Sequence, residues 1–557
     1  MPTRRGLVLS GCVYAFLVLI MWGAFNIHSG MPYETTFPYT SETSSWFNGF
    51  LYGDPLRIHT NTFYQLSYLM GEAFGIGGSY VPYQIIYALL WWARGVLVFL
   101  LLRRFLPSCL AVCYAAGALV IVHASDGALL WVGQMNQFGF IFWMLAAFYF
   151  LTLAFDSAHY GWAALFTMAA CLFESMSMFS YESPLLLLLV FPLALLAKRR
   201  TWRRLAVLTA AWYCVPACYL LLTLRRYLAA TGATYQESVM RKGWGLGSLM
   251  SDWSFNVVAS LKFWEWPRGG WKTSESQAIL LSLVAAMIFV AGGIAAIRVV
   301  RENGKTNPFV ESVQSVRTWL ALLTAGLVLL VLSFPVYLLL DSARGLWRTQ
   351  FLSGVGSGLT LTAMAGLVSH GVSRRPVRTA VFLVLGAVIV CFGSISAIQK
   401  GGFHRWVWER HRAAMAKILR AAPSVKPDTI VVLTNVPKDS DPFGDSMWLD
   451  VSLRLAYPGI PVAGTYFYAD GTRSPGNNLV AVGELWKWDG TGFPTAVREA
   501  PVANTIIVDS GQANAGSLVN VMPAFVCRAA CAVQSYNPAA VITGPIAPRA
   551  ARRYGIQ

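Results

Sequence analysis

Carboxylates next to apolar runs are the residues of this chain whose type and position suit chemistry. Glu42 follows the first apolar run, in a segment rich in aromatic residues and poor in basic ones. A carboxylate within reach of a hydroxyl can remove its proton as a general base, and the face of Trp46 could stack on a sugar ring. Glu34 and Asp54 lie in the same segment, so which of the three acts as the base stays open. Each could instead be solvated, and Asp54, before Pro55, could form a turn.

Two further carboxylates lie where apolar runs end, and a third lies inside one. Asp126 could cap a helix end or face the same cavity as Glu42. Glu182 lies between two runs, and functional and structural roles are equally compatible with that position. Glu174 is within a run, where an ionisable group suggests function by default; it could equally be neutral and hydrogen-bonded to Ser175 or Ser177.

Arginine pairs offer the complementary charge. Arg344 and Arg348 are four residues apart and would share one face of a helix, and guanidinium groups match phosphate oxygens in bidentate geometry. The alternative is an anchor that pairs with lipid headgroups. A second basic segment, about 225–276, holds Arg225, Arg226 and Lys242, and an anionic ligand would account for its charge. Arg94, inside an apolar run, is expected to be paired or to extend to the membrane surface.

The apolar runs that must position these residues decide the fold class. The chain has 557 residues, 56% hydrophobic and 12% charged, against ~25% charged in soluble domains. Runs of about 20 apolar residues suit helices that cross the ~30 Å hydrocarbon core. A soluble enzyme, a disordered chain and a disulfide-dense secreted module are therefore excluded. We predict a polytopic α-helical membrane protein with about eleven spans, at 7–25, 82–102, 106–123, 134–155, 161–181, 184–197, 205–224, 277–297, 318–340, 351–370 and 379–397.

Charge placement predicts the orientation of the chain. If the N-terminus is cytoplasmic, the inner loops carry sixteen of the 43 Lys and Arg residues, for example Arg103, Arg104, Lys198 and Arg375, against three acids. This is the pattern of the positive-inside rule, and it places residues after about 400 outside. The net charge of +17 is spread over loops, whereas a nucleic-acid binder would gather it in one soluble patch. Nucleic acid is therefore not an expected partner.

The predicted organisation has two domains. Residues 1–400 form the transmembrane domain, with outer loops at 26–80 and 225–276 and a short interfacial helix at 62–71. Residues 401–557 form an extracytoplasmic mixed α/β domain, with a helix at 404–421 and strands at 429–434 and 505–508.

Cysteines and motifs limit the cofactors that we expect. Seven of the nine cysteines fall in apolar runs and are expected to be small core residues. For Cys527 and Cys531, in the tail, a disulfide is favoured over a zinc site. The chain has no phosphate-binding loop, dinucleotide fingerprint or His-Glu-x-x-His motif. No cofactor is expected, although a divalent metal beside the carboxylates stays open.

The combined pattern resembles the bacterial GT-C superfamily of integral-membrane glycosyltransferases, such as relatives of the protein mannosyltransferases and the aminoarabinose transferases of lipid A. Ser41-Glu42 corresponds to the family's acidic pair, with one acid instead of two. The stretch from His123 to Asp126 is similar to the family's second outer loop. Tyr181-Glu182 resembles its Lys-Glu step, and Arg344 and Arg348 resemble its late arginines. These departures indicate a divergent branch.

The resemblance implies an activity and a place in the cell. It implies transfer of a sugar from a polyprenyl-phosphate donor to a glycan, lipid or protein acceptor on the outer face of a bacterial inner membrane. Glu42 would be the base and the late arginines would hold the donor phosphate. Two alternatives remain: a transporter or lipid flippase, although no internal repeat of the kind common in transporters is evident, and a non-catalytic assembly subunit.

Overall fold

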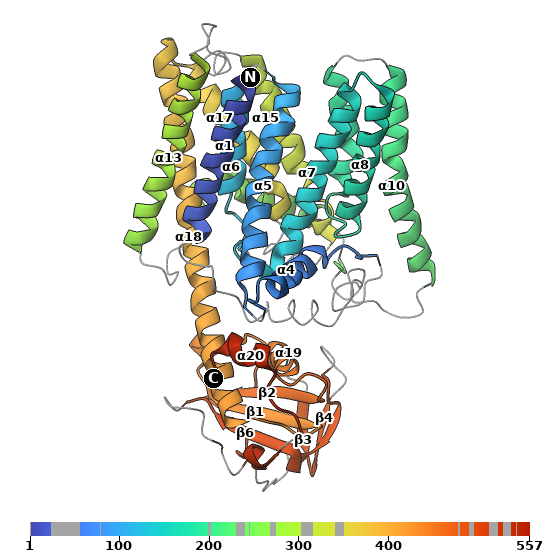
Figure 1. Ribbon diagram of the computed structural model, residues 1–557, viewed down its shortest axis with the longest axis vertical. Coiled ribbons are helices and arrows are strands. Elements are labelled where there is room, and N and C mark those ends of the chain that lie inside the picture. The colour runs from blue at the N-terminus through green and yellow to red at the C-terminus, as the bar shows by residue number, and fades with distance from the viewer. Residues whose placement is uncertain are drawn as a thin grey trace.

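Apolar runs of the sequence form a helical bundle, and one long helix connects the bundle to a smaller α/β domain (Figure 1). The structure is a computed structural model. It describes residues 2–23, 56–77, 79–107, 109–127, 129–198, 202–229, 240–243, 245–267, 275–301, 316–339, 350–476, 479–488, 495–511, 518, 522–526, 536–541 and 543–556.

Each predicted spanning range coincides with a helix of the bundle. Eight of the described helices are long and apolar enough to cross a membrane by length and composition, and α6 and α9 are shorter apolar helices. The bundle helices are α1 (Pro2–Val18, continued by a π-helical turn Leu19–Gly23), α5 (Val81–Phe105), α6 (Leu110–Val122), α7 (Met135–Asp156), α8 (Tyr160–Met178), α9 (Leu185–Ala194), α10 (Trp202–Ala229), α13 (Glu275–Arg301), α15 (Val316–Leu332), α17 (Gln350–His370) and α18 (Arg375–Ala421).

Helix α6 lies at the centre of the bundle. Every residue from Leu110 to Val122 is buried, as expected for a helix that is apolar all round. Helices α1, α5, α17 and α18 pack around it. A Cβ on Gly95 would lie 2.9 Å from the Gly117 carbonyl oxygen, so these two glycines allow α5 and α6 to approach closely. The residues that follow α6 therefore emerge in the middle of one end of the bundle.

Helix α4 (Thr62–Ala73) lies across this end of the bundle (Figure 1). Phe63, Tyr64 and Ser67 are buried, whereas Leu66 and Leu69 are exposed. The Phe63 ring stacks on Trp143 of α7 at 5.0 Å. An exposed apolar edge on a helix too short to span is typical of the membrane interface, and the predicted helix at 62–71 is confirmed.

Helix α18 combines two elements that the sequence analysis separated. It is continuous for 47 residues, about 70 Å at 1.5 Å per residue, and includes both the predicted span at 379–397 and the predicted helix at 404–421. Gly401 and Gly402 do not break it, because an interior glycine costs only about 1 kcal/mol and the buried neighbours Lys400 and His404 hold the helix against the bundle.

The C-terminal domain contains two small sheets. Strands β1 (Thr429–Val436), β2 (Val462–Tyr468) and β6 (Thr505–Asp509) form a parallel sheet in the order β2-β1-β6, with Ile430 opposite Ala463 and Thr505. Strands β3 (Leu479–Val482), β4 (Leu485–Trp488) and β5 (Glu499–Pro501) form an antiparallel sheet. Helix α19 (Ser446–Ala456) packs on β2. The two strands predicted at 429–434 and 505–508 are confirmed.

The domain contacts the end of the bundle where α6 finishes and α4 lies. Arg549, in α20 (Pro548–Tyr554), donates to Glu72 of α4 at 2.6 Å and to the Tyr68 hydroxyl at 3.1 Å. The Trp408 ring of α18 packs edge-on against Tyr80 at 5.0 Å. We call this the domain-proximal end of the bundle.

The cysteine prediction is only partly right. Cys109 and Cys113 are buried, as predicted, but Cys12, Cys214 and Cys218 are exposed on the bundle surface. A thiol is a small apolar group, so it is compatible with a surface that faces lipid. Cys527 and Cys531 lie outside the described residues.

Candidate active site

A polar cluster surrounds the residues that follow α6 at the domain-proximal end. Val122 is the last residue of α6, and an extended stretch, residues 123–126, leads away from it. Side chains from α5, α12 (Leu246–Leu261), α17 and α18 converge on this stretch. We call the group the domain-proximal polar cluster; its members are Arg94, His123, Ser125, Asp126, Asn256, Ser260, Gln350, Ser353, Ser396 and Lys400.

Asp126, which follows α6 in the chain, contacts the first residue of α17. Its side chain is 2% exposed, and its Oδ2 accepts a hydrogen bond from the backbone N–H of Gln350 at 3.1 Å. Gln350 is the first residue of α17. The first N–H groups of a helix lack partners within it, and the helix dipole favours negative charge there. The carboxylate is thus held in place by a helix from a distant part of the chain.

Two buried cations accompany Asp126. Lys400 of α18 donates to the Ala124 carbonyl and to Ser396 Oγ, the latter at 3.0 Å. Arg94 of α5 donates to the Val120 carbonyl at 2.6 Å and lies over the Phe138 ring. Both cations are 2% exposed, and charge at such positions is costly unless it is paired. The cluster therefore combines positive charge with one carboxylate in a region closed to bulk water.

Helix α17 approaches His123 and Arg94 closely. A Cβ on Gly354 would lie 3.0 Å from His123 Nδ1 and 3.3 Å from Arg94 Nη1. A side chain here would push α17 away from the stretch after α6. Glycine at this position therefore brings the start of α17 against His123 and Arg94.

The side chain of Gln350 joins three elements of the cluster. Its Oε1 accepts from Ser125 at 3.3 Å and from Ser260 of α12. Its Nε2 donates to Asn256 Oδ1 at 2.7 Å. Because all these contacts meet at one amide, the start of α17, α12 and the stretch after α6 hold one another in position.

Glu182 lies outside the domain-proximal polar cluster, in the turn between α8 and α9. Its carboxylate accepts two hydrogen bonds from Arg57 Nη2, at 2.7 and 3.0 Å, and the Arg57 guanidinium lies 4.6 Å from the Tyr181 ring centroid. The nearby His59 N–H donates to the Phe179 carbonyl at 3.1 Å. This ion pair thus ties the chain before α4 to the turn between α8 and α9.

The other predicted cations that the structure describes are on the surface. Arg225 is exposed and Arg226 half-buried, near the end of α10, which packs on α7, α8 and α9 away from the polar cluster (Figure 1). Lys242 is exposed, and its neighbour Arg241 is buried in an ion pair with Asp252. The structure therefore does not gather these cations around Asp126.

Six of the predicted site residues lie outside the described residues: Glu34, Glu42, Trp46, Asp54, Arg344 and Arg348. The described chain resumes at Leu56 and at Gln350. Asp54 is two residues before the first of these positions, and Arg348 is two residues before the second. The segment with both late arginines thus leads directly into the residue that contacts Asp126.

Sequence reasoning missed Lys400, Gln350 and Arg57. Lys400 follows Ser394 and Ser396 at the end of an apolar run; a single cation there, on the same helix face as Ser396, was a usable signal. The amide of Gln350 and the guanidinium of Arg57 have no such signal, since Asn256 and Glu182, which they contact, are more than 90 residues away.

A metal site is not seen in the described part of the chain. Within it, no three His, Cys, Asp or Glu side chains are grouped closely enough to hold a metal ion. The carboxylates at positions 34, 42 and 54 are not part of that set.

Comparisons with known proteins find similarity to solved structures. No family model and no curated protein sequence matches the chain. Among solved structures, ArnT from Cupriavidus metallidurans in the apo state is similar with a TM-score of 0.39 and 13% identity, over 79% of this chain and 84% of that one. The same protein bound to undecaprenyl phosphate gives a TM-score of 0.35 and 14% identity, over 78% and 83%.

Both similarities have a TM-score below 0.5 and an identity below 25%. A TM-score below 0.5 does not carry an activity from one protein to another. The function proposed below is therefore argued from the residues of this chain.

Glu174 of α8 gives a prediction about stability. Both carboxyl oxygens are buried and have no hydrogen-bond partner among the described residues. The Ser177 hydroxyl donates instead to the Phe140 carbonyl at 2.9 Å. Because an unsatisfied buried polar group costs about 1–3 kcal/mol, Glu174→Leu should raise the melting temperature of the purified protein by several degrees. A lower melting temperature would show that the carboxyl stabilises the fold. Ser177→Ala, which removes a hydroxyl that is bonded, serves as the contrasting variant and should lower it.

Proposed function

We propose that the protein is a glycosyltransferase that moves a sugar from a polyprenyl-phosphate donor to an acceptor at the domain-proximal end of the bundle. On the positive-inside pattern this end faces outward, where the acceptor would be a glycan, lipid or protein. A lipid-linked donor suits a site on that side, because the lipid itself carries the sugar to the membrane surface.

The contact between Asp126 and the start of α17 is the strongest support for the proposal. Asp126, a buried carboxylate, accepts the N–H of Gln350, the residue that directly follows the segment with Arg344 and Arg348. Lys400 contacts the Ala124 carbonyl in the stretch after α6, and Arg94 contacts the Val120 carbonyl in the last turn of α6. Carboxylate and cation chemistry therefore meet at the end of the membrane bundle next to the interfacial helix α4.

The reaction makes defined demands on these groups. The bond between the anomeric carbon and the phosphate oxygen breaks, and the leaving polyprenyl phosphate gains negative charge. Preorganised cations stabilise such developing charge; we assign this role to Arg344 and Arg348. Lys400 holds the Ala124 carbonyl, and Arg94 holds the last turn of α6. Arg225, Arg226 and Lys242 would attract the anionic donor along the surface.

The acceptor side of the reaction requires a base. The acceptor oxygen bonds to the anomeric carbon, which passes through an oxocarbenium-like state, and the hydroxyl proton moves to a carboxylate. We assign this role to Glu42, with Glu34 and Asp54 as the competing candidates and Trp46 stacked on the sugar. Asp126 would orient the acceptor, and Glu182 would keep the chain before α4 in place through Arg57.

Product analysis tests the proposal. The purified protein is incubated with a panel of polyprenyl-phosphate sugars and membrane extracts that contain acceptors, and the free polyprenyl phosphate is measured. We expect release with at least one donor. Absence of release with every donor, together with movement of one of these lipids between leaflets in proteoliposomes, would instead favour a flippase.

A further inference from the structure

A cavity in the C-terminal domain faces the bundle. It has a volume of about 730 Å³ and lies between the end of α19 with its following turn and α20. Figure 1 shows α19 and α20 on the side of the domain that is turned toward α4. The lining includes Leu455, Tyr457, Ile460 and Pro548, so part of the wall is apolar.

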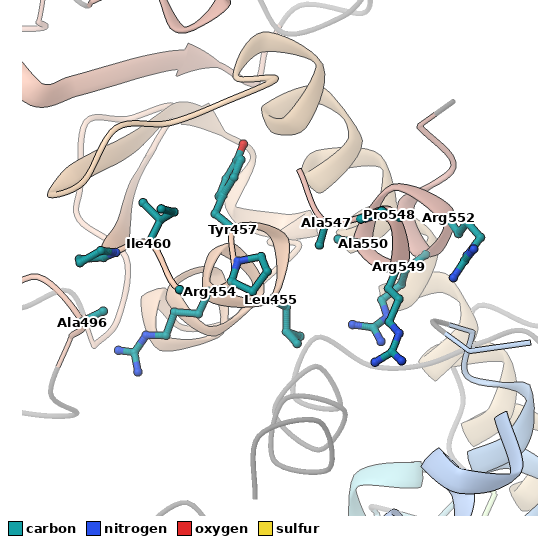
Figure 2. A pocket seen from close by; sticks show the side chains of 14 residues that line it. Arg454, Leu455, Tyr457, Ile460, Ala496, Ala547, Pro548, Arg549, Ala550 and Arg552 are labelled. Atoms are coloured by element: carbon teal, nitrogen blue, oxygen red, sulfur yellow. The ribbon is translucent and has the colours of Figure 1, made fainter. Parts of the chain in front are cut away.

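The charged residues in the described lining of this cavity are all basic. Among the described residues, its lining contains four arginines, Arg454, Arg549, Arg552 and Arg553, and no Asp or Glu. Figure 2 shows Arg454 and Arg549 on opposite sides, with their guanidinium groups directed to the same edge of the view. Four guanidinium groups around one opening create a positive potential that attracts anions.

Two of these arginines form ion pairs with acids among the described residues. Arg454 pairs with Asp450, and Arg549 pairs with Glu72 of α4 at 2.6 Å. Arg553 is 7% exposed and lies over the Tyr80 ring, and Arg552 is exposed. Arg552 therefore presents an exposed guanidinium group at the cavity.

The surroundings place the opening at the membrane surface. Arg549 contacts α4 through both Glu72 and Tyr68, and α4 exposes Leu66 and Leu69. An interfacial helix with exposed leucines lies at the level of lipid headgroups. The cavity is therefore next to the layer in which phosphate groups are most concentrated.

We propose that this cavity binds the phosphate of an anionic membrane lipid. Guanidinium groups match phosphate oxygens in bidentate geometry, basic pockets at the membrane surface bind such headgroups, and the apolar wall suits the carbon atoms next to the phosphate. The cavity is separate from the domain-proximal polar cluster, so the proposal does not depend on sugar transfer. Lipid binding here would hold the domain against the membrane.

Hydrogen exchange of the full-length protein in nanodiscs tests the proposal. We expect the backbone amides of residues 546–556 to exchange at least fivefold more slowly in phosphatidylglycerol than in phosphatidylcholine nanodiscs. Arg552→Glu should abolish this difference, and Arg552→Ala should reduce it. Arg420→Glu makes the same charge change at an exposed position of α18 that does not line the cavity, and should leave it unchanged.

Three results would overturn the proposal. The first is equal exchange in both kinds of nanodisc, and the second is slowing that persists in Arg552→Glu. The third is equal slowing by soluble glycerol phosphate added to phosphatidylcholine nanodiscs, which would identify a site for free phosphate. None of these results depends on transferase activity.

Discussion

Glu42→Gln abolishes transfer if Glu42 is the general base. The substitution keeps the size and hydrogen-bonding shape of the side chain but removes its ability to take a proton. General-base catalysis contributes about 10²–10⁴-fold, so we expect the rate of polyprenyl-phosphate release to fall by at least about a hundredfold. The rate is measured on purified protein with the donor that the wild type uses.

Two variants serve as matched controls for Glu42→Gln. Glu34→Gln and Asp54→Asn make the same charge change in the same segment, and both should retain most of the activity. Wild-type activity of Glu42→Gln, with loss of activity in one of the controls, would move the role of the base to that residue. An unchanged elution profile and melting temperature would show that the loss is not caused by unfolding.

Asp126→Asn separates a structural from a functional role of the buried carboxylate. Asparagine can still accept the N–H of Gln350, so the contact with the start of α17 survives, but the charge is lost. If the charge takes part in transfer, we expect the rate to fall about a hundredfold, equivalent to about 2.7 kcal/mol, while the melting temperature changes by only a few degrees.

The control for Asp126→Asn is at the opposite end of the bundle. Asp156, the last residue of α7, pairs with Lys198 at 2.6 Å. Asp156→Asn removes a charge of the same kind from an ion pair and should leave transfer unchanged. Wild-type transfer by Asp126→Asn would show that Asp126 only caps α17.

The sequence predicts the elements well because membrane spans carry a strong local signal. Runs of about 20 apolar residues mark the helices of the bundle, and β-branched runs mark β1 and β6. The sequence predicts the ends of these elements less accurately. Gln399 and Lys400 end an apolar run, yet α18 continues to Ala421 because Lys400 is buried against the Ala124 carbonyl.

The candidate site is harder to predict from the sequence, because it depends on contacts between residues that are far apart in the chain. Asp126 could be marked as a carboxylate at a helix end, but its partner Gln350 is 224 residues away. For Glu182 the sequence leaves both functional and structural roles open, and its bond to Arg57 joins residues that are 125 positions apart. Which face of a helix meets which neighbour is decided by packing, and an individual segment does not encode it.

Photo-crosslinking with a donor analogue tests the central claim most directly. A polyprenyl-phosphate sugar with a diazirine on the sugar is added to the protein in nanodiscs, irradiated and mapped by peptide mass spectrometry. We predict adducts within residues 24–55, 123–127 and 340–354, competed away by unlabelled donor. Adducts confined to the opposite end of the bundle, around the turn between α7 and α8, would contradict the account.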